Sequence, residues 1–259
     1  MVFENFFAYS SMIEEKGLDI GFELYGMGHL IWLVSILIVT VIISNIYKKS
    51  SHLQKEKIKR FFAVAILLSE ILKDIVLAIA GADMIGYLPM HLCSFAILGM
   101  MAHSYGHWQE VTGQLMAYAF FPGAIAALLF CNWTEYPFLN YMCIHSFAFH
   151  GWIVCYFVML YRAAEIRPSY SGLWKTVAAM LLASIPVYFF NTAFDTNYLF
   201  LNEASEGSPL VIVWNLFGTR FGEIGYLIGA ALLVIIVFHI LYVAYKLLSK
   251  IFREKGKTR

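Results

Sequence analysis

Two stretches of sequence, IWLVSILIVTVII (31–43) and LIGAALLVIIVF (227–238), decide the fold. Both are unbroken apolar runs without the polar–apolar alternation of a membrane barrel strand. Within lipid only helices and closed barrels satisfy every backbone polar group. Each run lies in a block that approaches the roughly 20 residues needed to cross about 30 Å of hydrocarbon. These stretches therefore predict membrane-spanning helices.

Similar apolar blocks fill most of the 259-residue chain, which is 61% hydrophobic and only 14% charged. Soluble domains are usually about 45–50% apolar and about 25% charged. The sequence predicts an all-α, polytopic transmembrane bundle, a single domain over 1–259 with a short N-terminal segment (1–28) and a basic tail (249–259). About seven spans are expected, at 29–47, 60–81, 88–105, 113–131, 141–163, 172–192 and 222–248.

The distribution of Lys and Arg predicts the orientation, because these residues concentrate on the cytoplasmic side. Fifteen of the 18 fall on one side of the predicted bundle, within 48–60, 162–175 and 246–259. The other side has Lys16 and Arg220, and Lys73 lies within a span. The N-terminus is therefore expected outside and the C-terminus inside, in a multi-pass protein of the cell membrane. Anionic lipid is a sufficient partner for the basic groups, and no nucleic-acid partner is expected. The acidic segment before the first span argues against a cleaved signal peptide.

Charged residues inside the second span are the first functional signal. Glu70 and Asp74 are four residues apart and share one helix face, while Lys73 can neutralise Glu70. An ionisable group at this depth costs about 2.5–3.5 kcal/mol, so it should face the bundle interior and have a partner. One interpretation is an ion pair that only stabilises the helix packing. The other is a carboxylate that orients a histidine or carries protons.

Further polar residues are expected at a common depth in the outer half of the bundle: His91 and Cys93 in the third span, His145 and His150 in the fifth, Asn191 and Asp195 at the end of the sixth. A thiol near an imidazole suggests nucleophilic catalysis, because a neighbouring His raises the thiolate fraction. The alternative is an inert Cys and His residues that hydrogen-bond across helices. His145 and His150 are about 140° apart around a helix, so they cannot both point at one spot.

The remaining Cys and His residues are interpreted as structural. Cys131 and Cys143 flank a short outer loop and could form a disulfide in an oxidising compartment. His29 and His239 are expected to be packing or interfacial residues, and His103 and His107 to be solvated in a cytoplasmic connector. No spacing resembles a structural zinc site, and neither a metal nor an organic cofactor is expected.

Five motifs in order carry a resemblance to a known family: LPMHLC (88–93), FPGAIAALLF (121–130), HSFAFHG (145–151), TNYLFLN (196–202) and GTRFGEIGYL (218–227). Together they resemble the bacterial YwaF-type integral membrane family. That family is similar to an animal transmembrane acyltransferase family that remodels ether phospholipids through a Cys and a His. Those proteins are distantly similar to small membrane hydrolases that use Thr and His. The resemblance covers the chain from about Gly28 to Tyr242.

The resemblance implies a Cys/His-dependent phospholipid acyltransferase or acyl hydrolase acting in the outer leaflet. Cys93 would be the nucleophile and His150 the base, and Asn191 or Asn197 would stabilise the oxyanion. An acidic residue often follows the Cys in the bacterial pattern, whereas this chain has Ser94. The carboxylate that orients His150 is then expected to be Asp74 or Asp195.

Two other classes of function stay open at this stage. In a small-molecule or proton-coupled transporter, Glu70, Asp74 and the His residues would form a polar path. Pro122, Gly123 and Pro186 interrupt helices, as in many transporters, although seven spans without a repeat fit that plan poorly. A non-catalytic partner subunit of a larger membrane complex is the third option. A covalent acyl adduct on a thiol would separate the enzyme from both.

The orientation predicts the behaviour of fusion proteins. A fluorescent protein fused to the C-terminus should be bright in the cytoplasm, and an alkaline phosphatase fused there should be inactive, because that enzyme needs the oxidising outer compartment. The opposite pattern would overturn the seven-span count.

Overall fold

The computed structural model describes residues 6–15 and 21–257, with side chains through 250. Lys16 and the last two residues of the predicted basic tail, Thr258 and Arg259, lie outside the described residues. Helices account for all regular structure in the described part, which contains no strand. The predicted all-α class is therefore confirmed.

The helices follow one another along the chain with short connections. Four pieces, η1 and η3 (3₁₀-helices) and η2 and η4 (π-helical turns), interrupt or join α-helices. The bounds are α2 Ser10–Glu15, α3 Met27–Lys49, α4 His52–Ala80, η1 Met84–Tyr87, α5 Leu92–Ser104, α6 Gln109–Leu115, η2 Met116–Phe120, α7 Phe121–Leu129, α8 Tyr141–Arg162, α9 Tyr170–Phe194, η3 Tyr198–Phe200, α10 Leu210–Val213, η4 Trp214–Gly218 and α11 Thr219–Lys257.

Helices lie at all seven predicted positions, and five segments of the described chain are long and apolar enough to cross a membrane. These five are Met27–Lys49, Gln109–Leu129, Tyr141–Arg162, Tyr170–Phe194 and Leu210–Lys250. The other two positions are occupied by α4, which is long but carries many charges, and by α5, which has only 13 residues. The structure thus supports a membrane protein with several apolar helices, and the count of seven stays a prediction.

The basic connector predicted between the first two spans is mostly helical, which corrects the expected start of the second span at residue 60. The α4 helix begins at His52, where Ser51 and Gln54 form a reciprocal capping box. Such a box satisfies two backbone donors that the helix itself leaves unpaired. The connection is reduced to Ser50 and Ser51, and the Lys residues of this region extend from helix ends rather than from a loop.

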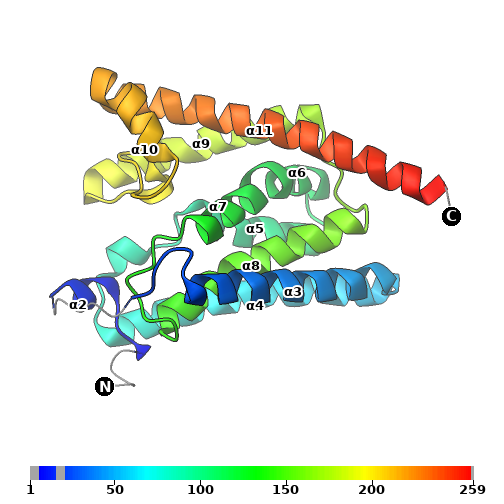
Figure 1. Cartoon of the computed structure of the whole chain (residues 1–259), viewed down its shortest axis with the longest axis horizontal. Coiled ribbons are helices and arrows are strands. Elements are labelled where there is room, and N and C mark those ends of the chain that lie inside the picture. Colours follow the sequence, from blue (N-terminus) through cyan, green and yellow to red (C-terminus); the bar gives the residue numbers. More distant parts are fainter. Residues whose placement is uncertain (1–5, 16–20, 258–259) are drawn as a thin grey trace.

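The last span also begins earlier than predicted. The segment from Leu210 to Gly218 is helical, and the chain then turns at Gly222, whose φ of 65° and ψ of −158° suit glycine alone. Gly229 of α11 lies against Val213 and Phe217, so the short segment folds back on α11 as a helical hairpin. Figure 1 shows this hairpin at the end of α11 away from the C-terminus.

The helices form two groups. In Figure 1, α3, α4, α5, α7 and α8 pack together. The α9 and α11 helices lie next to each other at the top of the view, beyond α6 and α7. α8 is the central helix, and its buried side chains include Phe147, Ile153 and Tyr156. By contrast α9 and α11 expose many large apolar residues, such as Leu182 and Ile240, which suits surfaces that face lipid. The core therefore sits around α8, and the polar residues of interest line it.

The close packing of α5 against η2 gives a prediction about Gly99. A Cβ at this position would lie 2.6 Å from Cε2 of the buried Phe120 and 3.3 Å from Cε of Met116. Gly99→Ala should therefore destabilise the fold by about 1–3 kcal/mol, the usual cost of overpacking. The measurement is the temperature at which the detergent-solubilised protein loses its monodisperse elution peak. Gly86→Ala in η1 is the control, because nothing lies within 4 Å of that added Cβ. Equal transition temperatures for both variants would contradict the packing.

Candidate functional site

The charged residues of α4 form an ion-paired group inside the bundle. Nζ of Lys73 lies 2.7 Å from Oε1 of Glu70 and 3.1 Å from Oδ1 of Asp74. It also lies 3.4 Å from the carbonyl oxygen of Tyr87 in η1. Glu70 and Lys73 are buried, whereas Asp74 is partly exposed. The two carboxylates thus share one ammonium, and the predicted pairing of Glu70 with Lys73 is confirmed.

His145 of α8 is the histidine nearest to this group. Its Nε2 lies 3.7 Å from Oε2 of Glu70, which is an electrostatic contact beyond hydrogen-bond distance. The ring is also buried against Phe149. Glu70 therefore lies between the Lys73 ammonium and the His145 imidazole, and α4 and α8 are linked through polar side chains.

The hydrogen bond made by His150 determines which of its ring nitrogens carries a proton. Nδ1 lies 2.7 Å from the carbonyl oxygen of Ser146, one turn earlier in α8. A carbonyl oxygen can only accept, so Nδ1 must be the N–H donor. In the neutral ring Nε2 then has a free lone pair and can act as a proton acceptor. The indole of Trp133 stacks on the ring at a centroid distance of 5.2 Å and an interplanar angle of 11°.

This bond corrects the expectation that a carboxylate orients His150. Asp74 is paired with Lys73, and Asp195 is an exposed residue at the end of α9. Helical side chains point back toward the N-terminus, which places an imidazole over the carbonyl group four residues earlier. The backbone of α8 and the stacked Trp133 therefore hold the ring.

Cys93 lies in the first turn of α5, where backbone N–H groups are not consumed by the helix. His91 is the N-cap residue, and its carbonyl oxygen accepts the N–H groups of Ser94 and Phe95. Glu70 and Lys73 are near enough to act on the thiol electrostatically. A helix N-terminus favours negative charge, whereas burial and the nearby Glu70 carboxylate act against a thiolate.

Among the described residues no hydrogen bond joins Cys93 to His150, although α5 and α8 are in contact further along. Nδ1 of His103, in the last turn of α5, lies 3.1 Å from the Tyr156 hydroxyl group of α8. Cys93 lies ten residues, or about 15 Å, before His103 on α5, and Ser146 lies the same distance before Tyr156 on α8. The Ser146 carbonyl group is the one that holds the His150 ring. His91 and His150 also interact electrostatically, so the start of α5 faces the middle of α8.

The structure corrects the expectation that His103 is solvated. It is 3% exposed and buried against Tyr156, while His107 is exposed as expected. The α5 helix extends to Ser104, which brings His103 into the bundle rather than into the connector.

The polar residues after α9 organise a loop. The amide group of Asn191 is buried and fully engaged, since Nδ2 donates to the Tyr198 carbonyl oxygen and Oδ1 accepts from Tyr198 N–H and the Thr196 hydroxyl group. Asn197 donates to the Glu203 carbonyl oxygen in the same loop. These bonds occupy the donors that were expected to reach an oxyanion. Their effect on the site is indirect, because they hold Tyr198.

Sequence reasoning missed Tyr198 and Trp133. The edge of Tyr198 packs on the His91 ring at 4.9 Å, and its hydroxyl group donates to the Ile85 carbonyl oxygen of η1. The η3 loop therefore covers the start of α5. Trp133 lies in the loop before α8 and stacks on His150. Aromatic residues in two outer loops were the available signal, but aromatics are common at membrane interfaces and do not stand out there.

A second Cys/His pair has the opposite hydrogen-bond pattern. Sγ of Cys131 lies 4.0 Å from Nε2 of His29. Nδ1 of His29 accepts the Tyr25 N–H, and Nε2 donates to the Leu128 carbonyl oxygen at 2.7 Å. His29 has no lone pair left for a thiol and is a packing residue, as predicted.

All four cysteines are free, so Cys131 and Cys143 do not form the disulfide that their spacing allowed. Over 6–15 and 21–257 no group of three or more His, Cys, Asp or Glu side chains is arranged to hold a metal ion.

These features define an integral membrane protein, an α-helical bundle that encloses a cluster of Cys, His and charged residues among apolar helices. The chain belongs to the TMEM164 family, since the model of that family matches residues 24–243. The match includes α3 to α10 and most of α11. No curated protein and no solved structure matches the chain.

The ion pair of α4 gives a prediction about folding. Lys73→Ala should lower the yield of folded protein, because it leaves the buried Glu70 carboxylate unpaired, a defect that typically costs about 3–5 kcal/mol. The double variant Glu70→Gln with Lys73→Met should recover much of the yield. The measurement is the monodisperse fraction in fluorescence-detected size-exclusion chromatography. Lys57→Ala, at an exposed position of α4, is the control. A double variant as poor as the worse single one would show that the pairing is not what these residues supply.

Proposed function

We propose that this protein is a Cys/His-dependent acyltransferase acting on phospholipids of the outer leaflet, with Cys93 as the nucleophile and His150 as the general base. The observation that carries the proposal is the hydrogen bond from His150 Nδ1 to the Ser146 carbonyl oxygen, which leaves Nε2 free to accept a proton. The motifs around both residues resemble those of Cys/His-dependent acyltransferases.

In the first half-reaction Nε2 of His150 takes the thiol proton of Cys93. The sulfur attacks the carbonyl carbon of a phospholipid ester and forms a tetrahedral intermediate. The ester C–O bond then breaks, the lysophospholipid oxygen leaves with the proton from His150, and the acyl group stays on Cys93 as a thioester. Transfer to the hydroxyl group of another lysophospholipid, deprotonated by His150, completes the reaction. Water in place of that hydroxyl group gives hydrolysis.

The start of α5 supplies the donors for the oxyanion in this proposal. The Cys93 N–H lies in the first turn of α5, beside the sulfur at which the intermediate forms. A single donor of this kind is typically worth about 2.7–4 kcal/mol. We assign this role to the backbone rather than to Asn191 or Asn197, whose amide groups are occupied within their loop.

The ion pair has a defined part in this chemistry. The Glu70 carboxylate is near enough to Cys93 to oppose a thiolate, and the Lys73 ammonium that binds this carboxylate acts in the opposite sense. Pairing them keeps the local charge close to neutral, so that the helix N-terminus can favour the thiolate. Glu70, Lys73 and His145 are thus positioning residues rather than reacting ones.

The depth of Cys93 supports a lipid substrate. Cys93 lies eleven residues, or about 16 Å, before the end of α5 at Ser104. Because the hydrocarbon core is about 30 Å thick, a Ser104 at its inner edge would put the thiol near the midplane. A lipid can reach such a site from the bilayer without crossing water.

A proton-coupled transporter is the second candidate, favoured by one observation. Glu70 lies 3.7 Å from His145 and is bound to Lys73, so three buried titratable groups connect α4 and α8. Such rows mark proton paths in membrane proteins. In that case no acyl group would become attached to the protein.

The test is covalent labelling of the purified protein by a phospholipid with a radiolabelled acyl chain. The parent should retain label that hydroxylamine releases, because hydroxylamine cleaves thioesters. Cys93→Ala should retain none, and His150→Ala should acylate at least about 100-fold more slowly, since general-base catalysis typically contributes 10²–10⁴-fold.

Cys131→Ala is the matched control, because Cys131 also lies beside a histidine but one without a free lone pair. It should keep the label, as should Cys155→Ala. Label that survives in Cys93→Ala, or a parent that never binds label, would overturn the proposal.

A further inference from the structure

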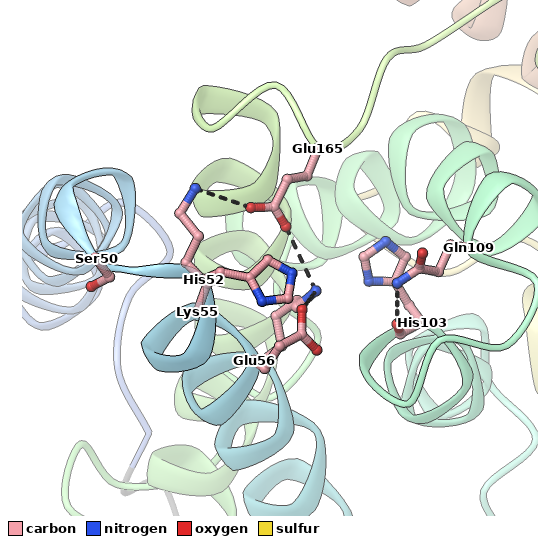
Figure 2. A pocket seen from close by; sticks show the side chains of 8 residues that line it. Ser50, His52, Lys55, Glu56, His103, Gln109 and Glu165 are labelled. Atoms are coloured by element: carbon pink, nitrogen blue, oxygen red, sulfur yellow. Dashed lines mark hydrogen bonds and ion pairs between the residues drawn. The ribbon is translucent and has the colours of Figure 1, made fainter.

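A polar cavity of about 420 Å³ lies at the basic end of the bundle, away from Cys93. Figure 2 shows side chains from the start of α4, the end of α5 and the connector after α8 converging on it. Every residue that lines it is polar or charged, among them His52, Lys55, Lys59, His103 and Glu165. The volume is typical of a small-molecule site, but such sites are mostly apolar. The lining therefore suits a charged group rather than an acyl chain.

The carboxylates of the cavity are already paired and anchored. Oε1 of Glu165 lies 3.2 Å from Nζ of Lys55, and its Oε2 accepts a hydrogen bond from the Tyr47 hydroxyl group at 2.7 Å. Glu56 lies 2.6 Å from Nζ of Lys59. Partial burial acts to raise the pKa of Glu56, but the hydrogen bond and charge of Lys59 outweigh it and hold the pKa below its ordinary value. Both carboxylates therefore neutralise lysines without filling the lysines' donors.

Lys59 has unused hydrogen-bond capacity directed into this space. Its side chain is only 5% exposed, yet its contact with Glu165 is 3.7 Å long, so Glu56 is the one acceptor within hydrogen-bond distance among the described residues. An ammonium group has three donors, and buried donors without acceptors are costly. Lys55, which is also partly buried, has a single ion pair. The cavity is thus short of acceptors.

The surroundings favour an anion as the missing acceptor. Four further cationic residues lie in the same helix ends as the lining residues: Lys48 and Lys49 at the end of α3, and Lys57 and Arg60 near the start of α4. A polar cleft at a surface of one sign concentrates counter-ions of the other. With Tyr156 as donor to its Nδ1, His103 presents an N–H at Nε2 as a further donor. Several N–H donors converging at headgroup depth match the oxygens of a phosphate group.

We propose that this cavity binds a phosphate group on the cytoplasmic side of the membrane, carried by an inner-leaflet lipid headgroup or by a soluble phosphate compound. Lys55, Lys59 and His52 supply the donors, and Glu56 and Glu165 keep the lysines in place. The site is independent of the acyl transfer proposed for Cys93.

The experiment is isothermal titration calorimetry on the full-length protein in detergent micelles. The probes are dioctanoyl phosphatidic acid, glycerol 3-phosphate, inorganic phosphate and, without phosphate, dioctanoylglycerol. At least one phosphate probe should bind at one site per chain. Lys55→Gln should weaken that binding roughly ten-fold or more, as expected for loss of a charge-assisted hydrogen bond.

His52→Ala, which removes a donor and leaves both ion pairs of the lysines intact, should also weaken binding and keeps the test valid if Lys55→Gln folds poorly. Lys57→Gln is the control on the same helix, exposed and outside the cavity, and should bind as the parent does.

Tighter binding of phosphatidic acid than of the soluble probes would identify a lipid headgroup, and the reverse order would identify a soluble compound. Three results would overturn the proposal: no binding of any phosphate probe, equal binding of dioctanoylglycerol and phosphatidic acid, or equal losses in Lys57→Gln and Lys55→Gln.

Discussion

The Lys73 ammonium, placed between Glu70 and Asp74, is the interaction on which the polar interior of this bundle depends. A carboxylate in hydrocarbon must be paired, and Lys73 pairs two of them from the same helix. Because Lys73 offsets the buried Glu70 carboxylate and Asp74 is partly exposed, α4 can pack against α5 and α8 with its polar face inward. That packing brings His145 toward Glu70 and leaves His91 and Cys93 beside the same group.

Apolar runs predicted most helices to within a few residues. Hydropathy expresses the free energy of transfer from water to an apolar phase, which is the same free energy that drives a segment into lipid. The α8 helix, predicted at 141–163, runs from Tyr141 to Arg162. Predictions failed where local backbone chemistry decides. The early start of α4 comes from the Ser51 cap within a charged segment, and the hairpin before α11 comes from the φ of Gly222. Hydropathy averages over windows and is insensitive to single caps and single dihedral angles.

For the candidate site, too, the sequence predicted one part and local geometry decided the other. Residue types and spacing predicted that Cys93, His91, His145 and His150 share one depth, and the contact of His103 with Tyr156 shows that α5 and α8 meet. What the sequence could not show is which histidine has a free lone pair. His150 bonds its own helix through Nδ1, whereas His29 uses both nitrogens. The difference depends on the rotamer and on the neighbouring carbonyl groups, which residue types do not encode.

The short length of α5 decides what its two ends contact. Its 13 residues span about 20 Å, less than the hydrocarbon core, so at least one end lies within the bundle. A buried helix start exposes N–H groups that need acceptors. The His91 carbonyl oxygen accepts two of them, from Ser94 and Phe95. At the other end His103 enters the wall of the phosphate cavity. A longer α5 would move its first turn away from Glu70 and Lys73, so the 13-residue length is what leaves a helix N-terminus, and a thiol with it, inside the bundle.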